Sequence, residues 1–312
     1  PGVHNLPNDT LFVPSGTTVY IDGGARVYGN IFTEGAHDVN IFGRGEVHPD
    51  GRGAGVWVRR SKNVRIDGIV VSQLPIGQCD SVELTNVKSI SYYGWGDGMD
   101  VFSSSNVILD GVFCRNSDDC AAVYASTQGF KGGSNNVLVK NATLWADVAH
   151  PINIGGHGDP NGMDTVQNVT FRNIDILDQA EKQIDYQGCL AINPGDNTLV
   201  RNITFENIRI EDFRNGQLVN FRISFNPKYC VSTGRGIQNV LVKDVTYNGS
   251  GENLSIIAGY DENHKISGIR FVNLVVNGRK ITDDMPGKPK WYKTGDMAGI
   301  FVGEHVENIS FE

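Results

Sequence analysis

Four aspartates in two close groups are the residues of this sequence best suited to do chemistry. Asp97 and Asp100 lie in "GDGMD", and Asp118 and Asp119 lie in "SDDC". Crowded carboxylates repel one another, so at least one of their pKa values must rise. Acid and base hydrolysis of a glycosidic bond requires one carboxyl group that keeps its proton and another that is ionised. The aspartates therefore indicate a candidate acid and base site.

Two other interpretations of the aspartates stay open at this point. Asp is a frequent turn former, so Asp100 or Asp110 can be purely structural. Three carboxylates can also form an oxygen cage for calcium. Such a cage would suit a lyase on the same scaffold, which also needs a basic residue to abstract a proton; Arg115 and Arg222 are the nearby candidates.

The elements that must position these aspartates belong to a repeat. Each copy is a polar turn, a short alternating strand, an Asn, Asp or Gly corner and a second short strand, as in "SNVILDGVFCRN" from residue 105. Copies begin at residues 37, 62, 80, 105, 135, 167, 201, 238 and 267, with a last fragment at 307. Repeats roughly 20 to 40 residues apart are typical of solenoids, and no ten-residue run keeps a helical period.

A unit of two or three short strands cannot bury its own apolar face, whereas stacked copies share one core. We therefore predict an all-β fold, a single-stranded right-handed parallel β-helix of about ten coils, in preference to a sandwich or a propeller. Residues 1–312 are expected to form a single domain. Adjacent coils rise by about 4.8 Å, and Asp97 precedes Asp118 by 21 residues. One turn of the solenoid should therefore bring Asp97 beside Asp118 and Asp119.

Composition excludes several classes of partner. The net charge is −8 and no run of Lys or Arg exceeds two residues, which argues against nucleic acid. No uninterrupted apolar stretch is long enough to span a membrane. The five cysteines are odd in number and lack the spacing of metal ligands, so we expect neither a disulfide scaffold nor a zinc site. We expect a monomer that is secreted or periplasmic.

The motifs together resemble the polygalacturonases, glycoside hydrolase family 28, over roughly residues 30 to 280. "GDGMD" is similar to their Asn-Thr-Asp-Gly-hydrophobic-Asp motif, and "SDDC" to their Asp-Asp-Cys. "GGHG" at residues 155–158 resembles their Gly-His-Gly, and "FRIS" at 221–224 stands where their Arg-Ile-Lys would fall.

The resemblance implies an inverting hydrolase of a polysaccharide or oligosaccharide, with no cofactor and no metal. It implies that Asp118 is the general acid and that Asp97 and Asp119 hold the attacking water. His157 would be a supporting residue that tunes the acid, and Arg222 would bind substrate. In an inverting enzyme the acid is expected roughly 6.5 to 9.5 Å from the base.

The departures from the family concern the charge of the substrate. Ser224 replaces the lysine of the family's motif, although Lys131, Lys228 and Arg235 in nearby loops can restore positive charge. The chain is also similar to the dextranase and isopullulanase family, glycoside hydrolase family 49, which cleaves neutral α-glucans and carries a β-sandwich before its β-helix. Such a sandwich, if it belonged here, would have been removed ahead of Pro1. A galacturonide and a neutral α-glucan both remain candidate substrates, and so does a non-hydrolytic binder or a lyase.

Aromatic residues near the motifs offer flat surfaces for sugar rings. Trp95 precedes the first aspartate group, Tyr124 follows the second, and Trp291 lies in the late loop "DDMPGKPKWYKTGDM". We predict that these three residues bind substrate.

Overall fold

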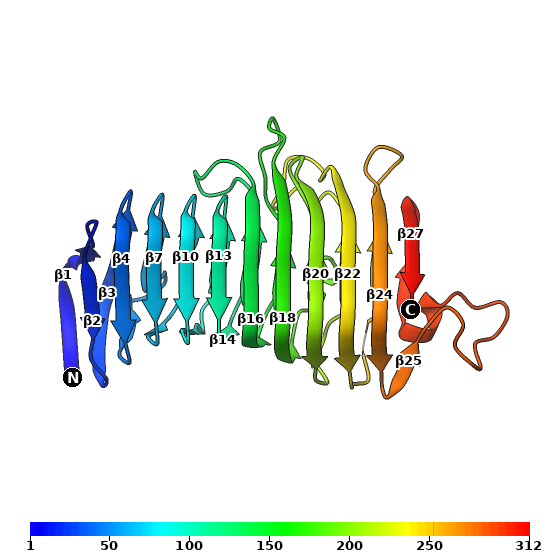
Figure 1. Ribbon diagram of the computed structural model, residues 1–312, viewed down its shortest axis with the longest axis horizontal. Helices are drawn as coiled ribbons and strands as arrows, with labels where there is room; N and C mark the ends of the chain where they lie inside the picture. Colours follow the sequence, from blue (N-terminus) through cyan, green and yellow to red (C-terminus); the bar gives the residue numbers. More distant parts are fainter. Residues whose placement is uncertain (252) are drawn as a thin grey trace.

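The computed structural model, which describes residues 1–251 and 253–312, is a solenoid of short strands (Figure 1). The strands form three parallel ladders that run along the solenoid. Successive coils each add a strand to every ladder, because each strand pairs with its counterpart in the next coil. The predicted parallel β-helix is therefore confirmed.

The first ladder contains β2 (Thr18–Ile21), β4 (His37–Gly43), β7 (Lys62–Asp67), β10 (Asp80–Thr85), β13 (Ser105–Asp110), the first halves of β16 (Ser134–Ala146), β18 (Thr165–Gln179), β20 (Leu199–Ile210), β22 (Gly236–Tyr247) and β24 (Ile266–Val276), and β27 (Val306–Phe311). The second ladder contains the first halves of β1 (Gly2–Phe12) and β3 (Ala25–Glu34), then β5 (Glu46–His48), β8 (Val70–Val71), β11 (Lys88–Ile90), β14 (Phe113–Asn116) and the second halves of β16, β18, β20, β22 and β24.

The third ladder contains the second halves of β1 and β3, then β6 (Val56–Arg59), β9 (Ile76–Gly77), β12 (Met99–Phe102), β15 (Ala121–Tyr124), β17 (Ile152–Ile154), β19 (Leu190–Ile192), β21 (Val219–Arg222), β23 (Ser255–Ala258) and β26 (Ile300–Val302). The remaining elements are β25 (Arg279–Ile281), antiparallel to β24, and the short 3-10 helices η1 (Ile184–Tyr186) and η2 (Gly295–Ala298). Neither helix of the described chain has the length to cross a membrane.

Alternate residues of the strands build the interior. Val107 pairs in register with Val137, Val169 and Ile203 on successive coils, and none of the four is more than 1% exposed. Because side chains alternate between the two faces of a strand, the same position in each copy points inward. Full burial of such a side chain is worth about 1.5–3 kcal/mol relative to exposure, so the stacked positions form one continuous core.

Asparagines stack at the corners between the first two ladders. Asn141, Asn173 and Asn207 all adopt left-handed backbone angles, with φ of 55°, 56° and 54°. The Asn173 amide donates to Asn141 at 2.7 Å, and the Asn207 amide donates to Asn173 at 3.3 Å. Asn tolerates this conformation better than other non-glycine residues, so the recurring asparagine both turns the chain and links neighbouring coils.

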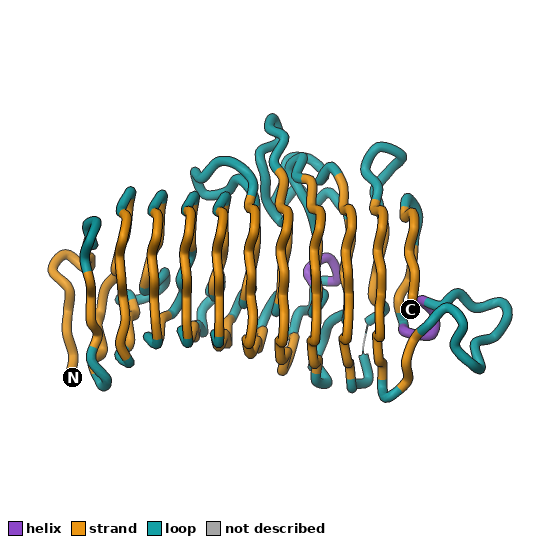
Figure 2. The backbone as a smooth tube through the Cα atoms, in the orientation of Figure 1, coloured by secondary structure: helices purple, strands orange, loops and turns teal. Residues whose placement is uncertain are grey.

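Loops between the ladders are uneven in length. Figure 2 shows that loops near the middle of the solenoid project beyond the strands, and that a separate loop between β25 and η2 extends outward at the C-terminal end. Several of the middle loops contribute residues to the lining of a cavity beside the aspartates, so the regular coils supply its floor and the loops supply its walls.

Candidate active site

The predicted aspartates converge beside the third ladder. Asp97 lies just before β12, and Asp118 and Asp119 occupy the bend between β14 and β15. Strand β12 pairs with β15, and the Gly98 N–H donates to the Asp119 carbonyl at 2.7 Å. One carboxylate oxygen from each of Asp97, Asp118 and Asp119 lies within 4.8 Å of the other two. One turn of the solenoid therefore joins the two motifs, as the repeat predicted.

The local sequence explains how two adjacent aspartates share one site. Neighbours in a regular strand face opposite sides, but residues 117–120 lie outside the strands, in a bend. Gly98 lets the two coils approach closely there, because a Cβ at this position would lie 2.2 Å from the Cys120 carbonyl oxygen. The Asn116 amide donates to the Asp97 carbonyl at 3.2 Å and fixes the first motif to the second.

Asp119 is buried and accepts four hydrogen bonds. Its Oδ1 accepts from the backbone N–H of His150 at 3.0 Å and lies 2.7 Å from the ring Nδ1 of His150. Its Oδ2 accepts from the Tyr124 hydroxyl at 2.5 Å and from the Asn153 amide at 2.8 Å. Burial by itself raises the pKa of Asp119, but the charge of His150 and these hydrogen bonds outweigh it and lower the pKa to about 2. Asp119 is therefore ionised.

The pKa values of the other aspartates shift in the opposite direction, upward. Burial and the charge of Asp119 raise the pKa of Asp118 to about 7. Burial, with the charges of Asp118 and Asp119, raises the pKa of Asp97 well above its usual value. Burial and the charge of Asp97 do the same for Asp100, which is 5% exposed in β12. Asp100 therefore lies in a strand rather than a turn, and it lines the same cavity as the other aspartates.

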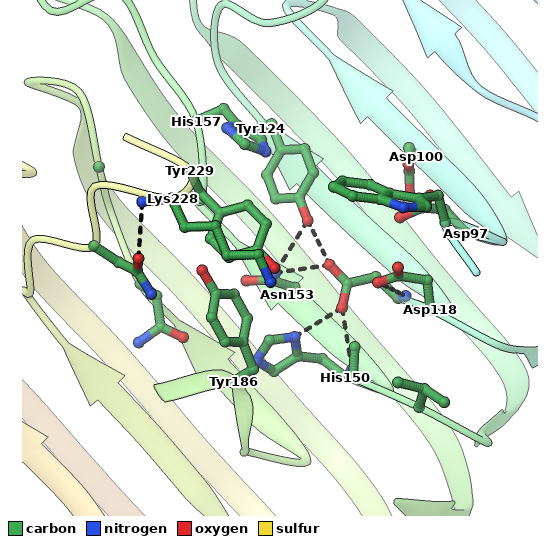
Figure 3. A pocket seen from close by; sticks show the side chains of 18 of the residues that line it. Asp97, Asp100, Asp118, Tyr124, His150, Asn153, His157, Tyr186, Lys228 and Tyr229 are labelled. Atoms are coloured by element: carbon green, nitrogen blue, oxygen red, sulfur yellow. Dashed lines mark hydrogen bonds and ion pairs between the residues drawn. The ribbon is translucent and has the colours of Figure 1, made fainter. Parts of the chain in front are cut away.

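A cavity of about 580 Å³ opens over these carboxylates (Figure 3), within the size range of small-molecule sites. Seven Phe, Tyr and Trp residues line it, namely Tyr92, Tyr93, Trp95, Phe102, Tyr124, Tyr186 and Tyr229. Its acidic lining comprises the four aspartates together with Glu181 and Asp185. Among the described residues, Lys228 is the single Lys or Arg of the lining. The cavity is therefore acidic and rich in rings.

Three further residues predicted from the sequence line this cavity. Trp95 is 68% exposed at its rim, where its ring is open to a ligand. Tyr124 is only 6% exposed, stacks on Phe102 and donates its hydroxyl to Asp119. The ring of His157 packs against the edge of Tyr124 with centroids 5.1 Å apart, and burial lowers the pKa of His157. In the part of the chain that the structure describes, the His157 ring forms no hydrogen bond with the aspartates.

Two predicted substrate-binding residues lie outside the cavity. Arg222 does not line it; its guanidinium pairs with Asp185 at 3.0 Å. Trp291 is 82% exposed in the loop between β25 and η2, at the C-terminal end of the solenoid, and is absent from the lining. Spacing in the sequence did not indicate either position, because both depend on the path of a loop or the direction of a side chain.

The structure adds two residues that sequence reasoning missed, His150 and Asn153. His150 lies in "AHPINIGG" before β17, one coil after Asp119, and the Cys120 N–H donates to its carbonyl at 2.9 Å. Asn153 lies in β17, which pairs with β15. The signal was present in the repeat, since both residues stand about one coil beyond the aspartate pair, but the coil here carries an insertion that obscures the spacing.

The distances within the aspartate cluster differ from the sequence-based expectation. The nearest oxygens lie within 4.8 Å of one another, which is shorter than the separation of about 6.5–9.5 Å between the carboxyl groups of inverting glycosidases. The reason is that Asp118 and Asp119 are neighbours in one bend, and Asp97 stands on the adjacent coil, which stacks at about 4.8 Å. The spacing of the carboxylates therefore does not by itself identify the stereochemistry.

Comparison with known proteins is consistent with this geometry. Residues 56–285 match glycosyl hydrolases family 28. A polygalacturonase of Juniperus ashei is 26% identical over 216 residues, covering 66% of this chain and 39% of its own length. An exopolygalacturonase of Cochliobolus carbonum is 24% identical over 246 residues, covering 68% and 52%. The chain thus spans about half the length, or less, of these relatives. The family 28 exopolygalacturonase structure from Yersinia enterocolitica shares the fold, with a TM-score of 0.68, 14% identity, and coverage of 98% of this chain and 72% of that one.

Proposed function

The chain belongs to glycosyl hydrolases family 28, and from that premise we propose that it hydrolyses α-linked bonds of a polysaccharide or oligosaccharide with inversion, in the manner of a polygalacturonase. One observation carries the proposal: Asp97, Asp118 and Asp119 meet at the cavity with one carboxylate oxygen of each within 4.8 Å of the other two, and their surroundings raise the pKa of Asp118 and lower that of Asp119. Paired carboxyl groups whose environments separate their pKa values are typical of acid and base catalysts.

The proposed mechanism assigns one proton movement to each side of the scissile bond. Asp118 is protonated near neutral pH and donates its proton to the leaving glycosidic oxygen as the bond to the anomeric carbon breaks. A water molecule beside Asp97 and Asp119 attacks that carbon from the opposite face and loses a proton to a carboxylate. No step requires a cofactor. His157 supports the site from behind Tyr124, and Trp95 offers its exposed ring to a sugar.

The stereochemistry of the product tests this proposal. We expect proton NMR of the first-formed reducing end to show the anomer opposite in configuration to the bond cleaved, before mutarotation mixes the two. An initial product with retained configuration would reject the inverting mechanism, and the absence of hydrolysis with every α-linked polysaccharide tested would reject the proposed function itself.

The preference of the site for a charged or a neutral substrate depends on Lys228. Its side chain lies over the Tyr229 ring, with Nζ 4.8 Å from the ring centroid, and it has no ion-pair partner among the residues that the structure describes. Lys131 instead pairs with Asp159 at 3.3 Å, and Arg235 donates to the carbonyls of Asn197 and Asp164. We therefore assign the recognition of a uronate carboxylate to Lys228 in place of Arg222.

Replacement of Lys228 by Met is expected to raise the KM for polygalacturonate about tenfold. The change removes a charge-assisted hydrogen bond of about 1.5–3 kcal/mol, and every 1.4 kcal/mol is tenfold in affinity. The unmutated protein should also bind polygalacturonate more weakly as salt rises. Initial rates at several substrate concentrations measure both effects.

Lys131→Met is the matched control, because it removes an exposed lysine outside the cavity. Cleavage of dextran or pullulan, with no sugar released from polygalacturonate, would favour the neutral-glucan alternative. That alternative is the second candidate because six acidic residues line the cavity. The secreted or periplasmic location and the monomeric state stay predictions.

A further inference from the structure

We propose that Asp97 alone accepts the proton of the attacking water, and that Asp119 acts as a fixed negative charge that keeps the proton on Asp118. This inference rests on the proposed function. It separates two aspartates that the family resemblance treats as one water-holding pair.

The hydrogen bonds of Asp119 leave it no free acceptor site. A carboxylate has about four lone-pair positions, and Asp119 uses all four, two on Oδ1 toward His150 and two on Oδ2 toward Tyr124 and Asn153. Figure 3 shows the bonds from the labelled Tyr124, Asn153 and His150 converging on one carboxylate. Asp119 must release a hydrogen bond before it can accept a proton, and its lowered pKa means that it binds protons weakly. It is therefore a poor base for the attacking water.

Asp97 is arranged in the opposite way. Among the described residues, no other residue donates a hydrogen bond to its carboxylate; the Asn116 amide contacts only its backbone carbonyl. Its side chain is half-buried and lines the cavity. Asp118 is intermediate, since its Oδ1 accepts from the backbone N–H of Asp119 at 3.0 Å and its Oδ2 accepts no hydrogen bond from the residues that the structure describes. Of the three carboxylates, Asp97 in its ionised form therefore has the most capacity to bind a water molecule, and its raised pKa makes it a stronger base for the proton of that water than Asp119.

The charge of Asp119 acts on Asp118 through space. The charged and titratable groups near Asp118 are Asp97 and Asp100 from the preceding coil, Asp119 beside it, His150 from the following coil and Glu181 from the coil after that. His150 opposes retention of the proton, whereas Asp119 and Glu181 favour it. Because Tyr124, Asn153 and His150 hold Asp119 ionised and in place, its charge is always present beside the acid. These three side chains are thus positioning residues.

The resulting step balances in atoms and charge. The water oxygen forms a bond to the anomeric carbon, and the bond from that carbon to the leaving oxygen breaks. The proton of Asp118 goes to the leaving oxygen, and one proton of the water goes to Asp97. Asp97 ends protonated and Asp118 ionised, and exchange with solvent restores the starting state.

Azide distinguishes the base from the fixed charge. Azide is an anionic nucleophile that needs no base, so it should restore activity to Asp97→Ala and yield a glycosyl azide of inverted configuration. Asp119→Ala should stay inactive with azide, because the acid there has lost its support. Rescue of Asp119→Ala, or no rescue of Asp97→Ala, would overturn the assignment.

A second measurement needs no substrate. Carbon-13 NMR titration of the Asp118 carboxyl group in Asp119→Asn should show its pKa lower than in the unmutated protein by at least about 0.5, the effect of a unit charge some 5 Å away even at the permittivity of water. Asp110→Asn, which removes a corner carboxylate paired with Lys140, should leave that pKa unchanged. An unchanged Asp118 pKa in Asp119→Asn would refute the fixed-charge role. A lowered pKa in a protein that hydrolyses no saccharide would instead refute only the proposed function.

Discussion

Asp118→Asn is expected to lower kcat/KM at least about 1000-fold, the largest effect of any single substitution considered. Asparagine keeps the shape of the side chain but has no proton to give to the leaving oxygen, and general acid catalysis contributes about 10²–10⁴-fold. Proper folding is expected to persist, because Asp118 is half-buried at the cavity and its side chain accepts a single hydrogen bond from the described part of the chain. Initial rates on polygalacturonate, with a thermal melt of both proteins, measure the two expectations.

The pH dependence of the unmutated protein should report the same group. Burial and the charge of Asp119 raise the pKa of Asp118 to about 7, so the acid is protonated below that pH and loses its proton above it. Activity should therefore fall as pH rises through about 7. A variant that retains more than a tenth of the unmutated rate, or an unaltered rate well above pH 7, would remove Asp118 from the acid role.

The second large effect is that of His150→Ala, which we expect to lower kcat about 10- to 100-fold. The ring Nδ1 lies 2.7 Å from Asp119, and the residue is 1% exposed. A hydrogen bond to a charged group contributes about 1.5–3 kcal/mol, and each 1.36 kcal/mol in the barrier is tenfold in rate. Without the ring, Asp119 loses an electrostatic partner and one of the bonds that hold it.

His157→Ala is the matched comparison. His157 lines the same cavity, but its ring contacts Tyr124 rather than a carboxylate, so its loss should cost less in kcat than the loss of His150. Single-turnover rates of the two variants, with KM measured separately, allow a direct comparison. A larger loss of kcat for His157→Ala than for His150→Ala would restore the role that the "GGHG" motif indicated.

The comparison of these two histidines shows where sequence reasoning stops. The motif "GGHG" placed a histidine near the site, and His157 does line the cavity. The histidine that contacts Asp119 stands seven residues earlier, in a turn that resembles no motif considered. Only the pairing of β15 with β17 brings that turn against the aspartates.

The sequence by itself determined the coil and its consequences. Alternating apolar residues and recurring asparagines dictate a stacked solenoid, because each copy can bury its apolar face only against its neighbours. Since coils stack at the spacing of hydrogen-bonded strands, two motifs one coil apart must be neighbours. The meeting of Asp97 with Asp118 and Asp119 followed directly, and so did the rise of at least one of their pKa values, whereas the low pKa of Asp119 depends on contacts that only the tertiary structure supplies.

The tertiary structure alone decided the walls of the cavity. Lys228 and Trp291 belong to loops whose course does not follow the repeat, whereas Arg222 ends strand β21 and its side chain pairs with Asp185; of the three, only Lys228 lines the cavity. The physical reason is that backbone hydrogen bonds between coils impose one register on the ladders, whereas loops of unequal length have no such register. Their paths, and the directions of their side chains, depend on packing and ion pairs that the period of the sequence does not encode.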